Sequence, residues 1–159
     1  MIERGARVRV LVVDDDVSVR AAVAVSIDDA EVCEASDGAT ALARMDVEPV
    51  DVVLLDVLMP DEDGFSVLER IRARRSPGPA VLMLTGLADE LDHLAAYRLG
   101  ADGYLTKPVD PDDLNDAVAR AYGRTPEERE AVRREEIARA ELLRTLEAGF
   151  EADWPTAPS

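Results

Sequence analysis

Five polar residues of this 159-residue chain stand at the ends of short apolar runs. They are Asp14, Asp15, Asp56, Thr85 and Lys107. In a parallel α/β sheet the carboxyl ends of the strands meet at one crevice, which is where such sheets bind ligands. Carboxylates can hold Mg²⁺, and an aspartate beside Mg²⁺ can attack a phosphoryl group while a lysine neutralises charge. These residues therefore predict a Mg²⁺ and phosphoryl site.

Strand-like and helix-like segments alternate five times before position 124 and must bring these residues together. The predicted strands are Val8–Val13, Val32–Ala35, Val50–Leu55, Ala80–Leu84 and Gly103–Thr106. The predicted helices are Val17–Ile27, Ala39–Met45, Phe65–Arg74, Glu90–Leu99 and Pro111–Tyr122. This alternation with short connections predicts an α/β fold, a parallel sheet with helices on both faces. We expect the flavodoxin-like, doubly wound order 2-1-3-4-5, in which the first and third strands are neighbours.

A sixth helix is predicted after Gly123, because Thr125, Pro126 and Glu128 form a capping box. The expected organisation is a domain over residues 5–123, a C-terminal amphipathic helix over 124–150 and a flexible tail over 151–159. The late apolar stripe of this extra helix is expected to dock on the domain or on a second copy, which would make a homodimer.

Composition limits the classes of partner. The net charge is -16 and both parts of the chain are acidic, so we expect no direct nucleic-acid binding, which normally needs a basic patch. The apolar runs are too short to span a bilayer and the start lacks the apolar stretch of a signal peptide, so we expect no membrane association and a cytoplasmic protein. The lone His93 is expected to be a surface residue.

Four segments, VLVVDDD, LLDVLMPDEDG, VLMLTG and ADGYLTKP, resemble the four blocks of a two-component response-regulator receiver domain. The resemblance covers roughly Val8 to Gly123. One departure is Asp28-Asp29-Ala30, where the family commonly has a Gly-aromatic turn. We therefore expect the first helix to end early or the second strand to shift.

The resemblance implies roles for the residues of the site. Asp56 would be the phosphoacceptor, and Asp15 and Asp56 would bind Mg²⁺ together with the backbone carbonyl of Leu58. Asp14 would act mostly through metal-bound water. Lys107 would pair with the phosphoryl group and precede a cis peptide bond at Pro108.

The resemblance also implies a switch pair, Thr85 and Tyr104. The hydroxyl group would move toward the phosphoryl group and the aromatic ring would turn inward, which would change a face centred on Leu87, Tyr97 and Tyr104. Leu58 and Leu87 match positions that flank the phosphoryl group, where apolar side chains should exclude water. We therefore expect a long-lived phosphoaspartate with slow self-dephosphorylation.

The leading interpretation is a phosphorylation-dependent switch of a two-component phosphorelay, and not an enzyme. A sensor histidine kinase or histidine phosphotransfer protein would supply the phosphoryl group, and a downstream protein would receive the signal. One alternative is the receiver fragment of a DNA-binding transcriptional regulator. Another is a haloacid-dehalogenase-type phosphohydrolase, which would use Asp14 as nucleophile and leave Asp56 unexplained.

Overall fold

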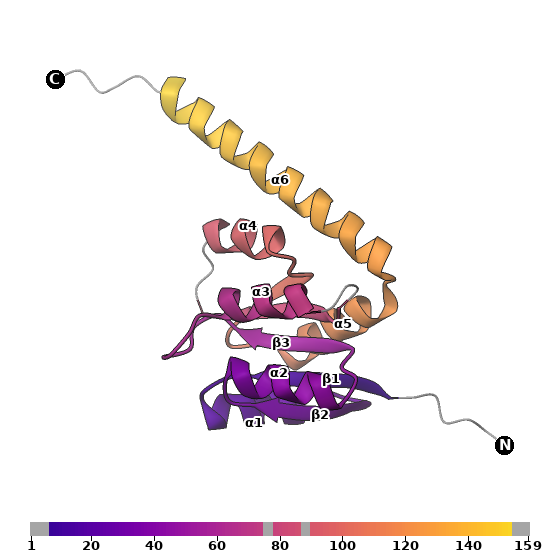
Figure 1. Cartoon of the computed structure of the whole chain (residues 1–159). Coiled ribbons are helices and arrows are strands. Elements are labelled where there is room, and N and C mark those ends of the chain that lie inside the picture. Colours follow the sequence, from indigo (N-terminus) through magenta and orange to yellow (C-terminus); the bar gives the residue numbers. More distant parts are fainter. Residues whose placement is uncertain (1–6, 75–77, 87–89, 154–159) are drawn as a thin grey trace.

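The computed structural model describes residues 7–74, 78–86 and 90–153. Its centre is a five-stranded parallel sheet in the order β2-β1-β3-β4-β5 (Figure 1). The strands are β1 Val8–Val13, β2 Ala30–Ala35, β3 Val52–Asp56, β4 Ala80–Thr85 and β5 Gly103–Thr106. The predicted strand order is therefore confirmed, and β1 and β3 are neighbours at the middle of the sheet.

Helices cover both faces of the sheet. They are α1 Val17–Ser26, α2 Gly38–Val47, α3 Gly64–Arg74, α4 Glu90–Arg98, α5 Pro111–Gly123 and α6 Pro126–Asp153. Alternate residues of the strands point to opposite faces, which divides the apolar core in two. Leu11 and Val13 of β1 pack with residues of α2 and α3, whereas Val10 and Val12 pack with residues of α1 and α5.

The connection between α1 and β2 differs from the prediction. Helix α1 ends at Ser26, and β2 begins at Ala30 instead of Val32. Asp29 adopts a left-handed backbone conformation, with φ of 52°, which reverses the chain within this short connection. Relative to the predicted bounds, the helix therefore ends one residue earlier and the strand begins two residues earlier. Strand β3 also begins later than predicted, at Val52 instead of Val50.

Helix α6 begins with the predicted capping box. The amide of Glu128 donates to the Thr125 hydroxyl at 3.1 Å, and the amide of Thr125 donates to the Glu128 carboxylate at 3.4 Å. The helix continues to Asp153, beyond the predicted end at residue 150. It lies over α4 and projects past it (Figure 1). Within the described ranges, no helix is both long enough and apolar enough to cross a membrane.

Candidate functional site at the carboxyl ends of the strands

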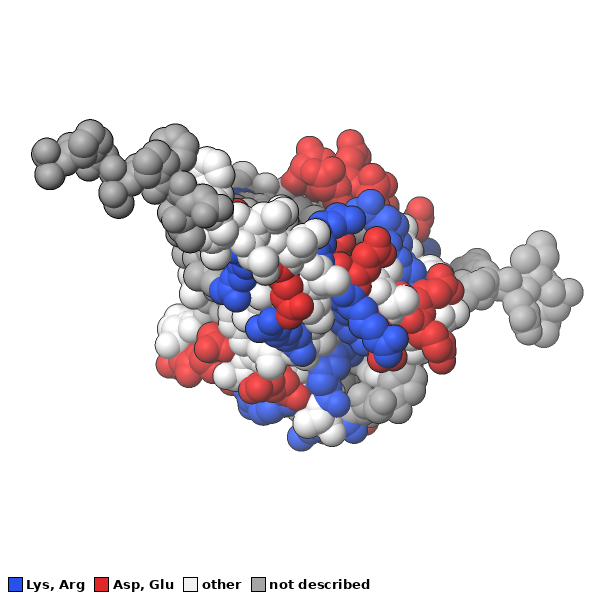
Figure 2. Space-filling view, turned by 90° about the horizontal axis from the view of Figure 1, so that it is seen from above, with Lys and Arg blue, Asp and Glu red and all other residues white. Residues whose placement is uncertain are grey.

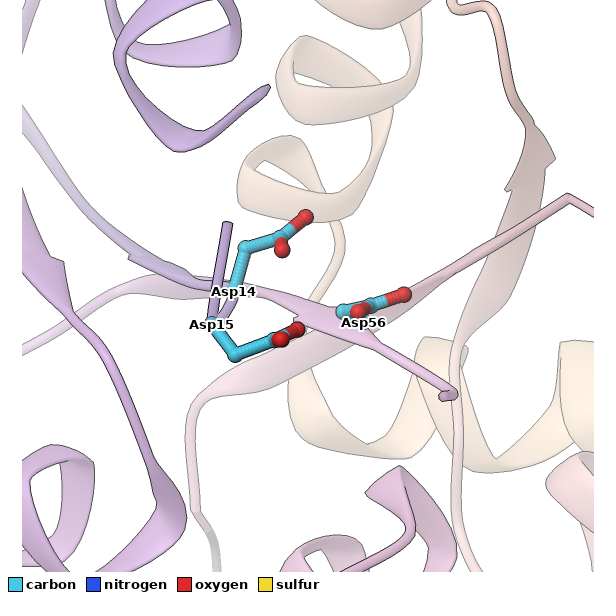
Figure 3. A group of neighbouring side chains, drawn as sticks. All are labelled: Asp14, Asp15 and Asp56. Atoms are coloured by element: carbon cyan, nitrogen blue, oxygen red, sulfur yellow. The ribbon is translucent and has the colours of Figure 1, made fainter. Parts of the chain in front are cut away.

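Three carboxylates meet where β1 and β3 end. Asp14 and Asp15 directly follow β1, and Asp56 is the last residue of β3. Each contributes an oxygen atom, and these atoms lie within 4.8 Å of one another (Figure 3). Asp14 and Asp56 are 1% and 5% exposed, whereas Asp15 is exposed. Hard cations such as Mg²⁺ take oxygen ligands and usually keep several waters, so a carboxylate cluster open to solvent on one side fits that ion.

Lys107 reaches this cluster from the end of β5. Its ammonium group donates to Asp14 Oδ2 at 2.8 Å and to Asp56 Oδ1 at 3.1 Å. Its backbone amide donates to the carbonyl of Thr85 at 2.7 Å, and the Lys107–Pro108 peptide bond is cis, as predicted. The lysine therefore bridges two aspartates that come from different strands.

The charges of the site shift the pKa values of its members. Burial raises the pKa of Asp56, and the charge of Asp14 adds to this, while Lys107 opposes it without cancelling it. Burial lowers the pKa of Lys107, but its hydrogen bonds and charge interactions with Asp14 and Asp56 outweigh burial and leave this pKa raised. The ammonium group is therefore held in its charged form by the two carboxylates.

Local contacts fix the position of Asp14. Its Oδ1 accepts a hydrogen bond from the amide of Asp16 at 3.0 Å, and its carbonyl oxygen accepts one from Arg20 at 2.7 Å. Asp16 is the N-cap of α1, where its side chain accepts from the amides of Ser18 and Val19. The third aspartate of the run thus begins the helix, while Asp14 and Asp15 face the site.

Gly64 was not singled out in the sequence and is required by the backbone of Asp56. Its amide donates to the carbonyl of Val57 at 2.7 Å, and a Cβ at this position would collide with the carbonyl oxygen of Asp56. The signal for it in the sequence is the glycine that closes LLDVLMPDEDG. Only a residue without a side chain allows the start of α3 to approach β3 this closely.

Leu58 is one of the two leucines predicted to flank the phosphoryl group, and it lies close to Asp56 in the sequence. The side chain of Leu58 is 61% exposed just beyond Asp56, and the backbone amide of Leu58 acts against burial by lowering the pKa of Asp56. Leu87 lies outside the described residues. Thr85 is 3% exposed at the end of β4, the strand that pairs with β3.

Tyr104 of β5 belongs to an aromatic group beside α4. Its ring stacks on His93, with ring centroids 3.5 Å apart and 19° between the planes. The ring of Tyr97 meets it edge-on, with centroids 6.4 Å apart. Burial raises the pKa of Tyr97 to about 12, and the charge of Glu136 on α6 adds to the shift. The expectation that His93 is a surface residue is wrong, since this half-buried ring packs against Tyr104.

The family model described as the response regulator receiver domain matches residues 10–119. The DNA-binding dual master transcriptional regulator RpaA of Synechocystis is 34% identical over 150 residues, which are 92% of this chain and 62% of the relative. The alkaline phosphatase synthesis transcriptional regulatory protein PhoP of Bacillus subtilis is 37% identical over 112 residues, which are 69% of this chain and 46% of PhoP. The chain thus spans about half to three-fifths of the length of these curated relatives.

Solved structures agree with the sequence relatives. Chemotaxis protein CheY4 of Vibrio cholerae is 34% identical, with a TM-score of 0.69 over 73% of this chain and 99% of CheY4. The BeF3-activated receiver domain of DrrB, a response regulator of Thermotoga maritima, is 34% identical, with a TM-score of 0.67 over 74% of this chain and 99% of that domain. The five-stranded sheet, the carboxylate cluster and these relatives lead to one conclusion: the chain belongs to the response regulator receiver family of two-component systems.

Proposed function

We propose that this chain is a switch that accepts a phosphoryl group on Asp56 from a sensor histidine kinase or histidine phosphotransfer protein. The observation that carries the proposal is the Lys107 ammonium group, which bonds to both Asp14 and Asp56. A carboxylate oxygen of Asp56 forms the new bond to phosphorus, while the bond between phosphorus and the donor's imidazole nitrogen breaks. The departing nitrogen takes up a proton, and Lys107 neutralises charge on the transferred group.

Mg²⁺ is part of the proposal because the family typically uses it and the donor set suits it. Asp15, Asp56 and the backbone carbonyl of Leu58 would hold the ion directly. Asp14 already accepts hydrogen bonds from Lys107 and the Asp16 amide, which supports a role through metal-bound water. When bound, the ion supplies positive charge for the phosphoryl oxygens.

Thr85 and Tyr104 are proposed to transmit the event to a downstream protein. Thr85 lies buried at the end of β4, and Tyr104 is 37% exposed on the neighbouring strand. Movement of the Thr85 hydroxyl toward the phosphoryl group would open space for the Tyr104 ring to turn inward. Such a change would shift an existing equilibrium between two arrangements of this surface.

The phosphoaspartate is proposed to hydrolyse slowly. The exposed Leu58 side chain lies beside Asp56 and offers no hydrogen bond to an attacking water. Leu58→Asn should therefore shorten the phosphoaspartate lifetime, measured as loss of radiolabel after acetyl phosphate is removed. Unchanged decay in this variant would contradict the role of Leu58.

Labelling with acetyl phosphate tests the central proposal. Intact-mass spectrometry in Mg²⁺ should show one added phosphoryl group on the parent, and none on Asp56→Asn. Asp61→Asn is the matched control, because Asp61 is an exposed acid of the same loop. A phosphoryl adduct that survives Asp56→Asn and disappears in Asp14→Asn would instead support the hydrolase alternative.

A second candidate is the receiver part of a DNA-binding transcriptional regulator. RpaA and PhoP are named as transcriptional regulators, and this chain spans only part of each. Electrophoretic mobility shift with promoter DNA separates the candidates when it is applied to the product of the complete gene. Specific binding would support the regulator, whereas its absence would leave protein contact as the output.

A further inference from the structure

The base of α6 is anchored to the domain through one buried aspartate. Asp102, 7% exposed, directly precedes β5 and accepts hydrogen bonds from the Val81 amide at 2.8 Å and from Arg72 at 2.8 Å. Two arginines of α6 complete the cluster, with Arg129 at 3.3 Å and Arg133 at 2.5 Å. The first turns of α6 are therefore held firmly to Asp102, which lies two residues before Tyr104 in the sequence.

The middle of α6 lies across α4 and leaves a partly open pocket beside Tyr104. The pocket has a volume of about 450 Å³ and lies between this part of the helix and the aromatic group of α4 and β5. Tyr104, Tyr97 and His93 line one side, and Glu136, Ala140, Leu143 and Glu147, which follow one stripe of the helix, are among the residues on the other. Across a pocket of this size the two surfaces are not closely packed against each other.

An exposed ion pair spans the same interface. Arg98 of α4 donates to Glu141 of α6 at 2.6 Å, and both side chains are 52% exposed. Acidic and basic side chains alternate over this side of the molecule (Figure 2). A pair this exposed is screened by water and salt, so it adds little to the docking of the helix.

We propose that residues 136–147 of α6 form an intramolecular cover over the Tyr104 face, and that docking of this cover opposes phosphorylation of Asp56. The inference rests on the proposed function. In the structure Tyr104 is 37% exposed, stacks on His93 and lines the same pocket as Leu143. If its ring turned inward, the pocket would grow and the stack on His93 would be lost, which would change the surface on which residues 136–147 dock.

Docking of the cover and phosphorylation of Asp56 affect each other reciprocally. Because the cover binds better when Tyr104 points outward, a docked cover holds the switch in its unphosphorylated arrangement. Release would expose Leu94 and Tyr97 and would increase the exposure of Tyr104 and Leu143, an apolar and aromatic surface suited to a protein partner. The partner and α6 would compete for the same face.

Cross-linking the full chain tests this inference. In a Cys33→Ser background, Arg98→Cys and Glu141→Cys are joined by a short bismaleimide, and the matched sample is capped with N-ethylmaleimide. Beryllofluoride with Mg²⁺ serves as the phosphoryl mimic, and its affinity is measured by calorimetry. We expect at least about five-fold weaker binding to the cross-linked protein, the lower end of typical allosteric coupling.

The outcomes are distinct. Equal or tighter binding to the cross-linked protein would overturn the cover, while leaving the phosphoacceptor intact. If neither sample binds beryllofluoride and the parent takes no label from acetyl phosphate, the proposed function falls and the cover falls with it. Spin labels on the same two cysteines give a second readout, since their separation should increase on addition of beryllofluoride and Mg²⁺.

Discussion

Replacement of Asp102 by alanine should destabilise the protein strongly. The carboxylate is almost fully buried and accepts hydrogen bonds from Val81, Arg72, Arg129 and Arg133. Removing one member of a buried charge cluster typically costs about 3–5 kcal/mol. In this variant Arg72 keeps its hydrogen bonds to the carbonyls of Gly100 and Pro79, and Arg129 keeps its hydrogen bond to the carbonyl of Gly78. Arg133 is partly exposed and can bond to water instead. We therefore expect the substitution to lower the free energy of unfolding by about 3 kcal/mol, the lower end of that range.

Arg72 shows why the aspartate is needed. Burial lowers the pKa of Arg72, the charges of Arg133 and Arg129 lower it further, and Asp102 is the partner that opposes these effects. Without Asp102, three guanidinium groups would remain close together without the carboxylate between them.

Urea unfolding followed by circular dichroism measures the cost. Asp102→Asn is the matched control, because it keeps the size and one acceptor while removing the charge, and it should cost less than Asp102→Ala. In a double-mutant cycle, Arg133→Met should cost less in the Asp102→Ala protein than in the parent. A cost below about 1 kcal/mol for Asp102→Ala, the range of an exposed ion pair, would refute the anchoring role.

Three further predictions concern the carboxylate site. Burial raises the pKa of Asp56, so at neutral pH the ionised carboxylate destabilises the folded state. Asp56→Asn should therefore melt at a higher temperature than the parent at neutral pH, and this difference should disappear at acidic pH, where the parent's carboxyl group is protonated. Lys107→Met removes a positive charge beside the carboxylates, so Mg²⁺ should bind more tightly in calorimetry while acetyl phosphate labelling slows; unchanged Mg²⁺ affinity would count against a shared site. Gly64→Ala should lower the free energy of unfolding by about 1–3 kcal/mol in urea titration, because the added Cβ collides with backbone that cannot move freely.

The sequence predicts the sheet and its site well because both depend on local patterns. Fully buried strands such as Val52–Asp56 are continuous apolar runs, and each run ends in the polar residue that faces the crevice. Once the strand order is known, the approach of Asp14, Asp15 and Asp56 follows without further information. The roles assigned to these residues remain proposals.

Long-range contacts could not be predicted in the same way. Nothing in the pattern around Asp102 indicates that two arginines from α6, 27 and 31 residues later, converge on it. The same holds for His93, whose burial depends on Tyr104 and on the path of α6. An amphipathic pattern shows that α6 has an apolar side, but not which surface of the domain it meets.

The length of α6 has a mechanical consequence. The helix has 28 residues, and its firm anchor ends near Arg133, so about 20 residues extend beyond it. At 1.5 Å per residue this arm is roughly 30 Å long. A tilt of only about 10° at the base would carry the far end some 5 Å, roughly the pitch of one helical turn. If the Tyr104 ring rearranges as proposed, this arm would act as a lever that enlarges a small movement at the base of α6 into a displacement of its far end.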